Sequence, residues 1–227
     1  MPRIETTDTK VKIAIGVLLA ATLAFAWFGV RWQIGNMFAE LTSPAQPGSD
    51  AIARYAVSLA PGDPLAAWLA ASKERENFSS ESIENSVRLF EETVRLSPYD
   101  FRWWIELGRA YEQAERFEEA ENAIKRSIDL APEYTFPRWQ YGNFLIRRGR
   151  VDEAFAELNK AAQKSSVYRE QVFSLAWDYF GRDAAAVEKI AGDAPDVRAS
   201  LALFFAARGA SAEALRNWNL LTPEQKA

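Results

Sequence analysis

The sequence predicts an all-α protein in which helical hairpins follow a single apolar helix. Three observations lead to this prediction. Residues 13–30 contain no charged residue. After residue 50, proline and glycine clusters separate segments with apolar residues at helical spacing, for example Ala120, Ala123 and Ile124. Small and apolar residues also recur 34 positions apart, and no segment shows the alternation expected of a strand.

The composition fits a folded chain and removes many kinds of chemistry. Of the 227 residues, 48% are apolar and 26% are charged, and neither His nor Cys is present. Without Cys there is no disulfide or thiolate nucleophile, and without His there is no Ser-His-Asp triad and no common zinc site. The net charge of −4 gives no reason to expect a nucleic-acid partner. We therefore expect no catalytic, cofactor-binding or metal-binding residues.

Residues 13–32 are predicted to form a transmembrane anchor helix behind a short tail at residues 1–12. As a helix, the uncharged stretch would extend about 27 Å, close to the thickness of a hydrocarbon core. Trp27 and Trp32 lie toward one end, where aromatic rings favour the membrane interface. A cleaved signal peptide is the alternative, because Ala24-Phe25-Ala26 has the form of a cleavage site. The apolar run continues past that site, which favours a retained anchor.

Basic residues around this segment predict its orientation. Arg3, Lys10 and Lys12 precede it, whereas only Arg31 follows it closely, so the N-terminus is expected to stay in the cytoplasm. The remaining chain would then lie across a cell inner membrane, in the periplasm of a Gram-negative bacterium. A cytosol-facing adaptor with the opposite topology is the alternative.

One face of the anchor carries Gly16, Ala20 and Ala24 at intervals of four residues. Small residues at this spacing let a second transmembrane helix approach closely, from a partner or from a second copy in a homodimer. An inert anchor with chance spacing is the other interpretation.

The organisation beyond the anchor follows from its proline and glycine residues. The stretch TSPAQPGS at residues 42–49 predicts a linker over residues 33–49. A repeat domain is expected over residues 50–222, with a tail at residues 223–227. In order, the domain would contain a lone second helix before Pro61, a hairpin with its loop around residues 76–80, two hairpins related by 34 residues, a hairpin with a short second helix near residues 183–191, and a last hairpin containing Leu201 and Trp218.

The residues that recur define a motif. Trp104-x2-Leu107-Gly108-x2-Tyr111 is followed by Ala120-x3-Ile124 and Pro132, and Gly142, Ala154 and Leu158 repeat three of these positions 34 residues later. This pattern resembles the tetratricopeptide repeat family, strongly over residues 101–162 and loosely elsewhere. The resemblance implies a right-handed superhelix of stacked hairpins, in which small residues let helices approach and large ones fill the space between hairpins.

The resemblance also implies that the first helix of each hairpin lines a concave groove that holds a protein or peptide partner. Carried onto this chain, the groove positions are Arg102, Glu106, Arg109, Gln113, Trp139, Gln140, Asn143, Arg147, Glu170, Phe173 and Trp177. Some members of the family clamp a terminal carboxylate with Lys, Asn and Arg, and only Asn143 and the arginines suggest such a clamp here.

Two groups of these residues have alternative interpretations. Arg102, Arg109 and Arg147 would form a basic strip for an acidic peptide or an anionic glycan, or would be surface arginines paired with Glu106 and Glu112. Three tryptophans would line a partner surface or pack between helices. These are Trp103, Trp139 and Trp177.

Acidic pairs provide the only catalytic alternative. Glu91-Glu92 and Glu118-Glu119 are adjacent on predicted helices, so their carboxylates do not face each other across a cleft. The sequence therefore predicts a non-enzymatic, membrane-anchored scaffold in a bacterial envelope assembly for translocation, maturation or polysaccharide export. A glycan-active enzyme that uses carboxylates is the remaining alternative.

Overall fold

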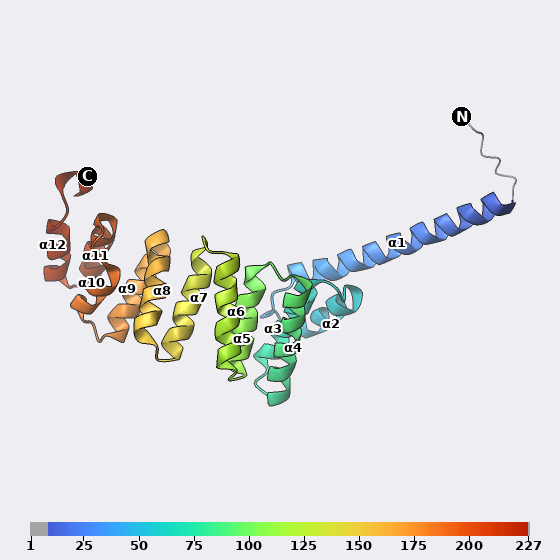
Figure 1. Cartoon of the computed structure of the whole chain (residues 1–227), viewed down its shortest axis with the longest axis horizontal. Helices are drawn as coiled ribbons and strands as arrows, with labels where there is room; N and C mark the ends of the chain where they lie inside the picture. Colours follow the sequence, from blue (N-terminus) through green and yellow to red (C-terminus); the bar gives the residue numbers. More distant parts are fainter. Residues whose placement is uncertain (1–8, 227) are drawn as a thin grey trace. The chain divides into compact units, whose positions relative to one another are not determined.

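The structure is a computed structural model that describes residues 9–226. All regular secondary structure within that range is α-helical, which confirms the all-α prediction (Figure 1). The chain forms two compact units, Met1–Arg116 and Phe117–Ala227.

Over residues 9–116 the first unit contains five helices, in which neighbours along the chain pack against each other. They are α1 (Thr9–Leu41), α2 (Ser49–Leu59), α3 (Pro64–Glu76), α4 (Ser80–Leu96) and α5 (Phe101–Gln113).

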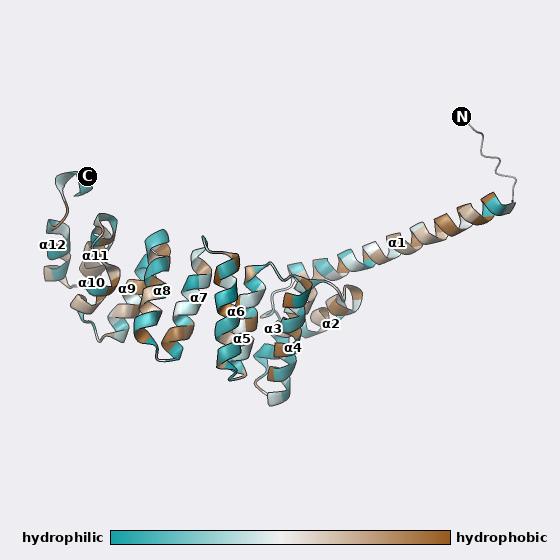
Figure 2. Cartoon of the chain, in the orientation of Figure 1, coloured by the Kyte–Doolittle hydropathy of each residue, from teal (hydrophilic) through white to brown (hydrophobic). Residues whose placement is uncertain are grey.

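Most of α1 extends away from the rest of this unit (Figure 1). Its apolar part is unburied, and the helix is long and apolar enough to cross a membrane. Figure 2 shows the apolar residues along this part of α1. Lys10 and Lys12 lie at its start, whereas Arg3 lies outside the described residues.

The junction between α1 and α2 differs from the expected linker over residues 33–49. Helix α1 continues to Leu41, and its last third packs on α2 and α3. The physical reason is the small size of Gly35 and Ala39, which are buried at this contact. A Cβ atom on Gly35 would lie 2.7 Å from the Ala60 Cβ and 2.9 Å from the Ala56 carbonyl oxygen. Helix α2 is therefore not a lone helix, because the end of α1 is the first helix of its hairpin.

Helices α3 and α4 form the next hairpin. The turn at residues 77–79 lies where a loop was expected, but it is short, and the extra residues extend α4 to 17 residues. Asp63 and Ser79 cap the two helices, because their side chains accept hydrogen bonds from the Leu65 and Ser82 backbone N–H groups.

The second unit contains eight helices among the described residues. They are α6 (Phe117–Leu130), α7 (Thr135–Arg147), α8 (Val151–Lys164), α9 (Ser166–Tyr179), α10 (Ala184–Ala191), α11 (Pro195–Ala207), α12 (Ser211–Asn219) and α13 (Pro223–Lys226). Each boundary of α7 and α8 lies 34 residues after the corresponding boundary of α5 and α6. The helices thus follow the period seen in the sequence.

The core of the second unit lies between its hairpins. Phe155, Leu158, Phe173 and Phe205 are among its buried side chains, and they come from α8, α9 and α11. Gly142 lets α7 approach α8, because a Cβ atom there would lie 2.5 Å from the Leu158 Cγ. Helix α10 has only eight residues, as its short segment predicted.

Candidate functional site

A large hollow lies beside the junction of α1 with the first hairpins. It encloses about 970 Å³, and its walls come from the end of α1, from residues 42–44, and from α3 and α5. Trp68 and Trp103 form one side, with ring centroids 6.1 Å apart. Asn36 and Arg102 also line it, so this anchor-side hollow combines aromatic surface with hydrogen-bonding groups.

A second hollow of about 460 Å³ shares Pro44 and Trp68 with the first. The carboxylate of Glu106, which lines this hollow, accepts from the Arg75 Nη1 at 2.5 Å and also from the Nη1 of Arg109, which lies outside the lining, at 2.7 Å. The Gln113 amide donates to the Arg75 carbonyl oxygen at 3.2 Å. These hydrogen bonds bring together Glu106, Arg109 and Gln113, three of the predicted groove residues.

The arginines of the predicted basic strip in this unit have carboxylate partners. Arg102 makes bonds to both carboxylate oxygens of Asp100 and holds the pKa of that carboxyl below its ordinary value. Arg109 pairs with Glu106, as the surface-arginine interpretation proposed. Trp103 is buried, so most of its ring packs between helices and only a small part borders the anchor-side hollow.

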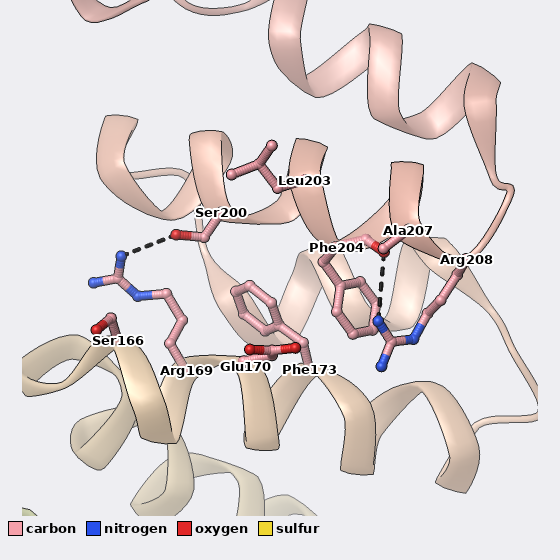
Figure 3. Close-up of a pocket in the computed structure, with 9 residues that line it drawn as sticks. All are labelled: Ser166, Arg169, Glu170, Phe173, Ser200, Leu203, Phe204, Ala207 and Arg208. Carbon is pink, nitrogen blue, oxygen red and sulfur yellow. Dashed lines mark hydrogen bonds between the residues drawn. The ribbon is translucent and has the colours of Figure 1, made fainter.

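The second unit has a hollow between α9 and α11, which encloses about 330 Å³ (Figure 3). Phe173 and Phe204 lie at its base with ring centroids 5.5 Å apart, and Leu203 stands at its edge with 70% of its surface exposed. Figure 3 shows the phenyl rings between two guanidinium groups, those of Arg169 and Arg208.

The two arginines of this α9–α11 hollow differ in their surroundings. Arg169 is buried, and it donates to the Asp196 carboxylate at 2.7 Å and to the Ser200 hydroxyl at 3.2 Å. Arg208 is exposed, and its Cζ lies 3.7 Å from the centroid of the Phe204 ring. It donates to neutral oxygens of Ser174 and Phe204. Arg169 thus links α9 to α11 beside the hollow, whereas Arg208 presents a positive charge at its surface.

The predicted groove residues of the second unit fall into two groups. Trp139 and Trp177 are half-buried and pack against Tyr168 and against Phe204 and Phe205, so most of their surface is used between helices. Phe173 is buried at the base of the α9–α11 hollow. The remaining residues are half-buried or exposed, and they are Gln140, Asn143, Arg147 and Glu170.

Asn143 is the residue that suggested a carboxylate clamp. Its side-chain amide donates to the Trp139 carbonyl oxygen in the same helix at 2.8 Å. This bond uses one of the two N–H donors that a clamp would offer to a ligand.

Sequence reasoning missed several residues that line these hollows. Arg75 lies 34 positions before Arg109, so the same period extended upstream would have identified it. Trp68 lies 34 positions before Arg102 and has the same signal. Leu203 and Arg208 have none, because α11 departs from the 34-residue spacing.

The acidic pairs are part of ion pairs or face solvent. Glu92 pairs with Arg95, which lowers the pKa of the carboxyl, and Glu91 accepts from the Tyr111 hydroxyl at 2.8 Å. Glu118 is exposed. No group of three or more His, Cys, Asp or Glu residues within 9–226 is placed to hold a metal ion.

Gly16, Ala20 and Ala24 lie on the exposed part of α1. No atom lies within 4 Å of a Cβ atom built on Gly16. The face predicted to contact another transmembrane helix is thus accessible in this chain.

Comparison with known proteins gives one match to a family. Residues 101–134, which begin where α5 begins, match the tetratricopeptide repeat. A 91-residue stretch, 40% of this chain, is 28% identical to Superkiller protein 3 of Saccharomyces cerevisiae and spans 6% of that protein.

Several solved structures are similar at low identity. MamA of Desulfovibrio magneticus RS-1 aligns over 59% of this chain and 73% of its own, with a TM-score of 0.47 and 20% identity. YrrB, described as a TPR protein with an unusual peptide-binding site, aligns over 74% and 89%, with a TM-score of 0.44 and 14% identity. A human IFIT1 dimer with m7Gppp-AAAA aligns over 86% and 50%, with a TM-score of 0.49 and 16% identity.

The sequence match and the helix boundaries agree on the same residues. The chain is an all-α helical-hairpin protein in which residues 101–134 match the tetratricopeptide repeat.

Proposed function

We propose that this chain is a single-pass membrane-anchored scaffold that holds a protein or peptide partner on the inner surfaces of its repeat helices. The observation that carries the proposal is the continuity of α1, whose outer part is apolar and unburied and whose last third is packed into the first hairpin. A chain built in this way displays a repeat domain at a fixed place beside a membrane.

Partner-binding surfaces are proposed in each unit by itself: two hollows on α3 and α5 in the first unit, and the α9–α11 hollow in the second. These hollows combine exposed apolar side chains with a few charged groups, which is the usual composition of a binding surface. Leu203 and Arg208 are the exposed apolar and cationic groups of the α9–α11 hollow. A peptide with an apolar residue next to an acidic one would satisfy both.

Site-specific photo-crosslinking in native membranes tests this partner surface. A photoreactive residue at Leu203 is expected to capture a partner, whereas the same residue at Leu215 is not. Leu215 is a matched control because it is 61% exposed and lies on α12, in the same terminal hairpin but outside the hollow. Equal capture at both positions would remove the α9–α11 hollow from the proposal.

The proposed orientation keeps the N-terminal tail in the cytoplasm and the repeats on the opposite side of a bacterial inner membrane. Lys10 and Lys12 before the apolar stretch, against Arg31 after it, support this orientation. A reporter that is active only in the periplasm, fused after Ala227, is expected to be active. Activity restricted to a cytosolic reporter would instead establish the cytosol-facing adaptor.

A role in an envelope assembly is the most specific part of the proposal. Purification of the full chain from membranes in mild detergent, followed by identification of the proteins crosslinked at Leu203, would name that assembly. A partner from outside the envelope would contradict this part of the proposal while leaving the scaffold itself intact.

A further inference from the structure

The end of α2 lies close to the point where α1 leaves its uncharged stretch. That stretch ends at Val30, and Arg31 directly after it donates a hydrogen bond to the Ser58 carbonyl oxygen at the end of α2. Gly35 touches the same end of α2 at Ala56 and Ala60. Along a helix, four residues from Arg31 to Gly35 correspond to about 6 Å.

If α1 spans a bilayer, the rise from Arg31 to Gly35 along α1 determines the depth at which the end of α2 lies. The polar headgroup layer on each side of the hydrocarbon core is about 5–8 Å thick. A contact that is about 6 Å beyond the first charged residue therefore falls within the headgroup layer. The end of α2 cannot move away from this level without breaking its packing on Gly35.

The exposed residues at this end of α2 suit an interface. Arg54, Tyr55 and Ser58 are exposed and share one side of the helix, whereas Ala53, Ala56 and Ala60 are buried. Tyr55 is 62% exposed. A cation beside an aromatic ring with a polar end is the combination that lipid headgroups favour.

The charges of the neighbouring elements do not oppose this placement. Asp63, the carboxylate nearest in sequence to the end of α2, is buried and hydrogen-bonded to Asn36 and Leu65. Asp50 lies one turn before Arg54, toward the start of α2, and the Lys73 ammonium is 3.9 Å from it. The surface at the end of α2 is thus basic, with Arg31 and Arg54.

We propose that the last turns of α2, with the Pro61-Gly62 turn, form a membrane-contact surface on which Arg54 and Tyr55 bind lipid headgroups. This inference depends on the proposed anchoring of α1. It adds that the first hairpin rests on the bilayer, so that the repeat domain is not a tethered module at the end of a flexible linker.

The absence of native cysteine allows a direct test, because each introduced thiol carries a single fluorophore. Full-length variants Leu23→Cys, Tyr55→Cys and Phe78→Cys would be labelled and reconstituted in phosphatidylcholine–phosphatidylglycerol vesicles. Leu23 reports on the span, and Phe78 is the matched aqueous control, because it is 81% exposed in the α3–α4 turn of the same unit. Lipids with a nitroxide on the headgroup or on the acyl chain serve as quenchers.

We expect the headgroup nitroxide to reduce fluorescence more at position 55 than at position 78, and the acyl-chain nitroxide to reduce it at position 23. Equal quenching at positions 55 and 78, with position 23 still quenched by the acyl chain, would overturn the membrane-contact surface and leave the anchor intact. Loss of acyl-chain quenching at position 23 would overturn both proposals. Arg54→Cys serves as a second position, since it is exposed and is expected to behave as position 55 does.

Discussion

The side-chain amide of Asn36 donates a hydrogen bond of 2.6 Å to the carboxylate of Asp63. The same carboxylate caps α3, because it accepts from the Leu65 backbone N–H at 2.9 Å. Asp63 is 2% exposed, so water does not replace either donor. One buried carboxylate thus links α1 to the N-terminus of α3, the first helix of the next hairpin.

We expect Asn36→Ala to lower the free energy of unfolding by about 1–3 kcal/mol, because the buried Asp63 carboxylate loses a hydrogen-bond donor. Asp63→Ala also loses the helix cap. The control is Asp183→Ala, since Asp183 caps α10 in the same way from an exposed position and should cost only about 1 kcal/mol. Urea unfolding of the full chain in detergent, followed by circular dichroism, measures all three. An Asp63→Ala cost no larger than that of Asp183→Ala would contradict the coupling between α1 and α3.

Gly35 gives a second test of the same junction. Gly35→Val would place side-chain atoms against Ala60 and the Ala56 backbone, which cannot yield as a flexible side chain would. We expect a loss of about 1–3 kcal/mol from this overpacking. Gly29→Val is the matched control, because nothing lies within 4 Å of a Cβ atom there. Protease protection of the junction in vesicles offers an independent measurement, and equal protection of both variants would argue against close packing of α1 on α2.

The hairpins could be predicted from the sequence, whereas the course of α1 could not. Residues 108, 120, 142 and 154 are small, lie on the 34-residue period and are buried in the structure, so this local pattern was sufficient. The segment from residue 33 to residue 41 contains one buried glycine and one buried alanine, which is too little to distinguish a packed helix from a linker. The tertiary contact with α2 decides its conformation.

The candidate site was predictable only in part, because the exposure of a side chain depends on which other helices pack against it. Of the predicted groove residues, Arg109 donates to Glu106, and Gln113 donates to the Arg75 carbonyl oxygen. Phe173 occupies a groove position in the sequence pattern, but the ring is buried because Phe204 from α11 packs against it. Helix α11 departs from the 34-residue spacing, so the period could not show which residues of α11 reach α9.

Arg169 should organise the α9–α11 hollow rather than bind a partner. Arg169→Met keeps the apolar stem but removes the bonds to Asp196 and Ser200, and we expect a loss of about 1.5–3 kcal/mol. Arg208→Met should leave the unfolding free energy within about 0.5 kcal/mol, since Arg208 is exposed. Urea unfolding compares the two. In the crosslinking experiment, Arg208→Met should reduce capture at Leu203, and unchanged capture would remove Arg208 from the partner surface.

The Glu121 network should make the stability of the second unit depend on pH. Burial alone would raise the pKa of Glu121, but hydrogen bonds from Lys125, Tyr141 and Arg150 outweigh it and lower that pKa to about 2. The Tyr141 hydroxyl donates at 2.7 Å and the Arg150 Nη1 at 2.6 Å. These contacts link the carboxylate on α6 to α7 and to the start of α8.

The direction of this pH dependence follows from the different pKa of Glu121 in the folded and unfolded chain. Between pH 4.5 and pH 2 the unfolded chain binds a proton at this carboxyl and the folded chain does not, so the stabilisation is present above pH 4.5 and is lost as the pH falls toward 2. After allowance for solvent screening we expect about 1–2 kcal/mol from this group. Glu121→Gln should therefore lower the urea midpoint at pH 7 and lower it by less than half as much at pH 3, where part of the stabilisation is already lost. Glu118→Gln removes the same charge from an exposed position on α6 and should change neither midpoint. If Glu121→Gln lowered the two midpoints equally, the contribution of Glu121 would come from packing rather than from its ionised carboxylate.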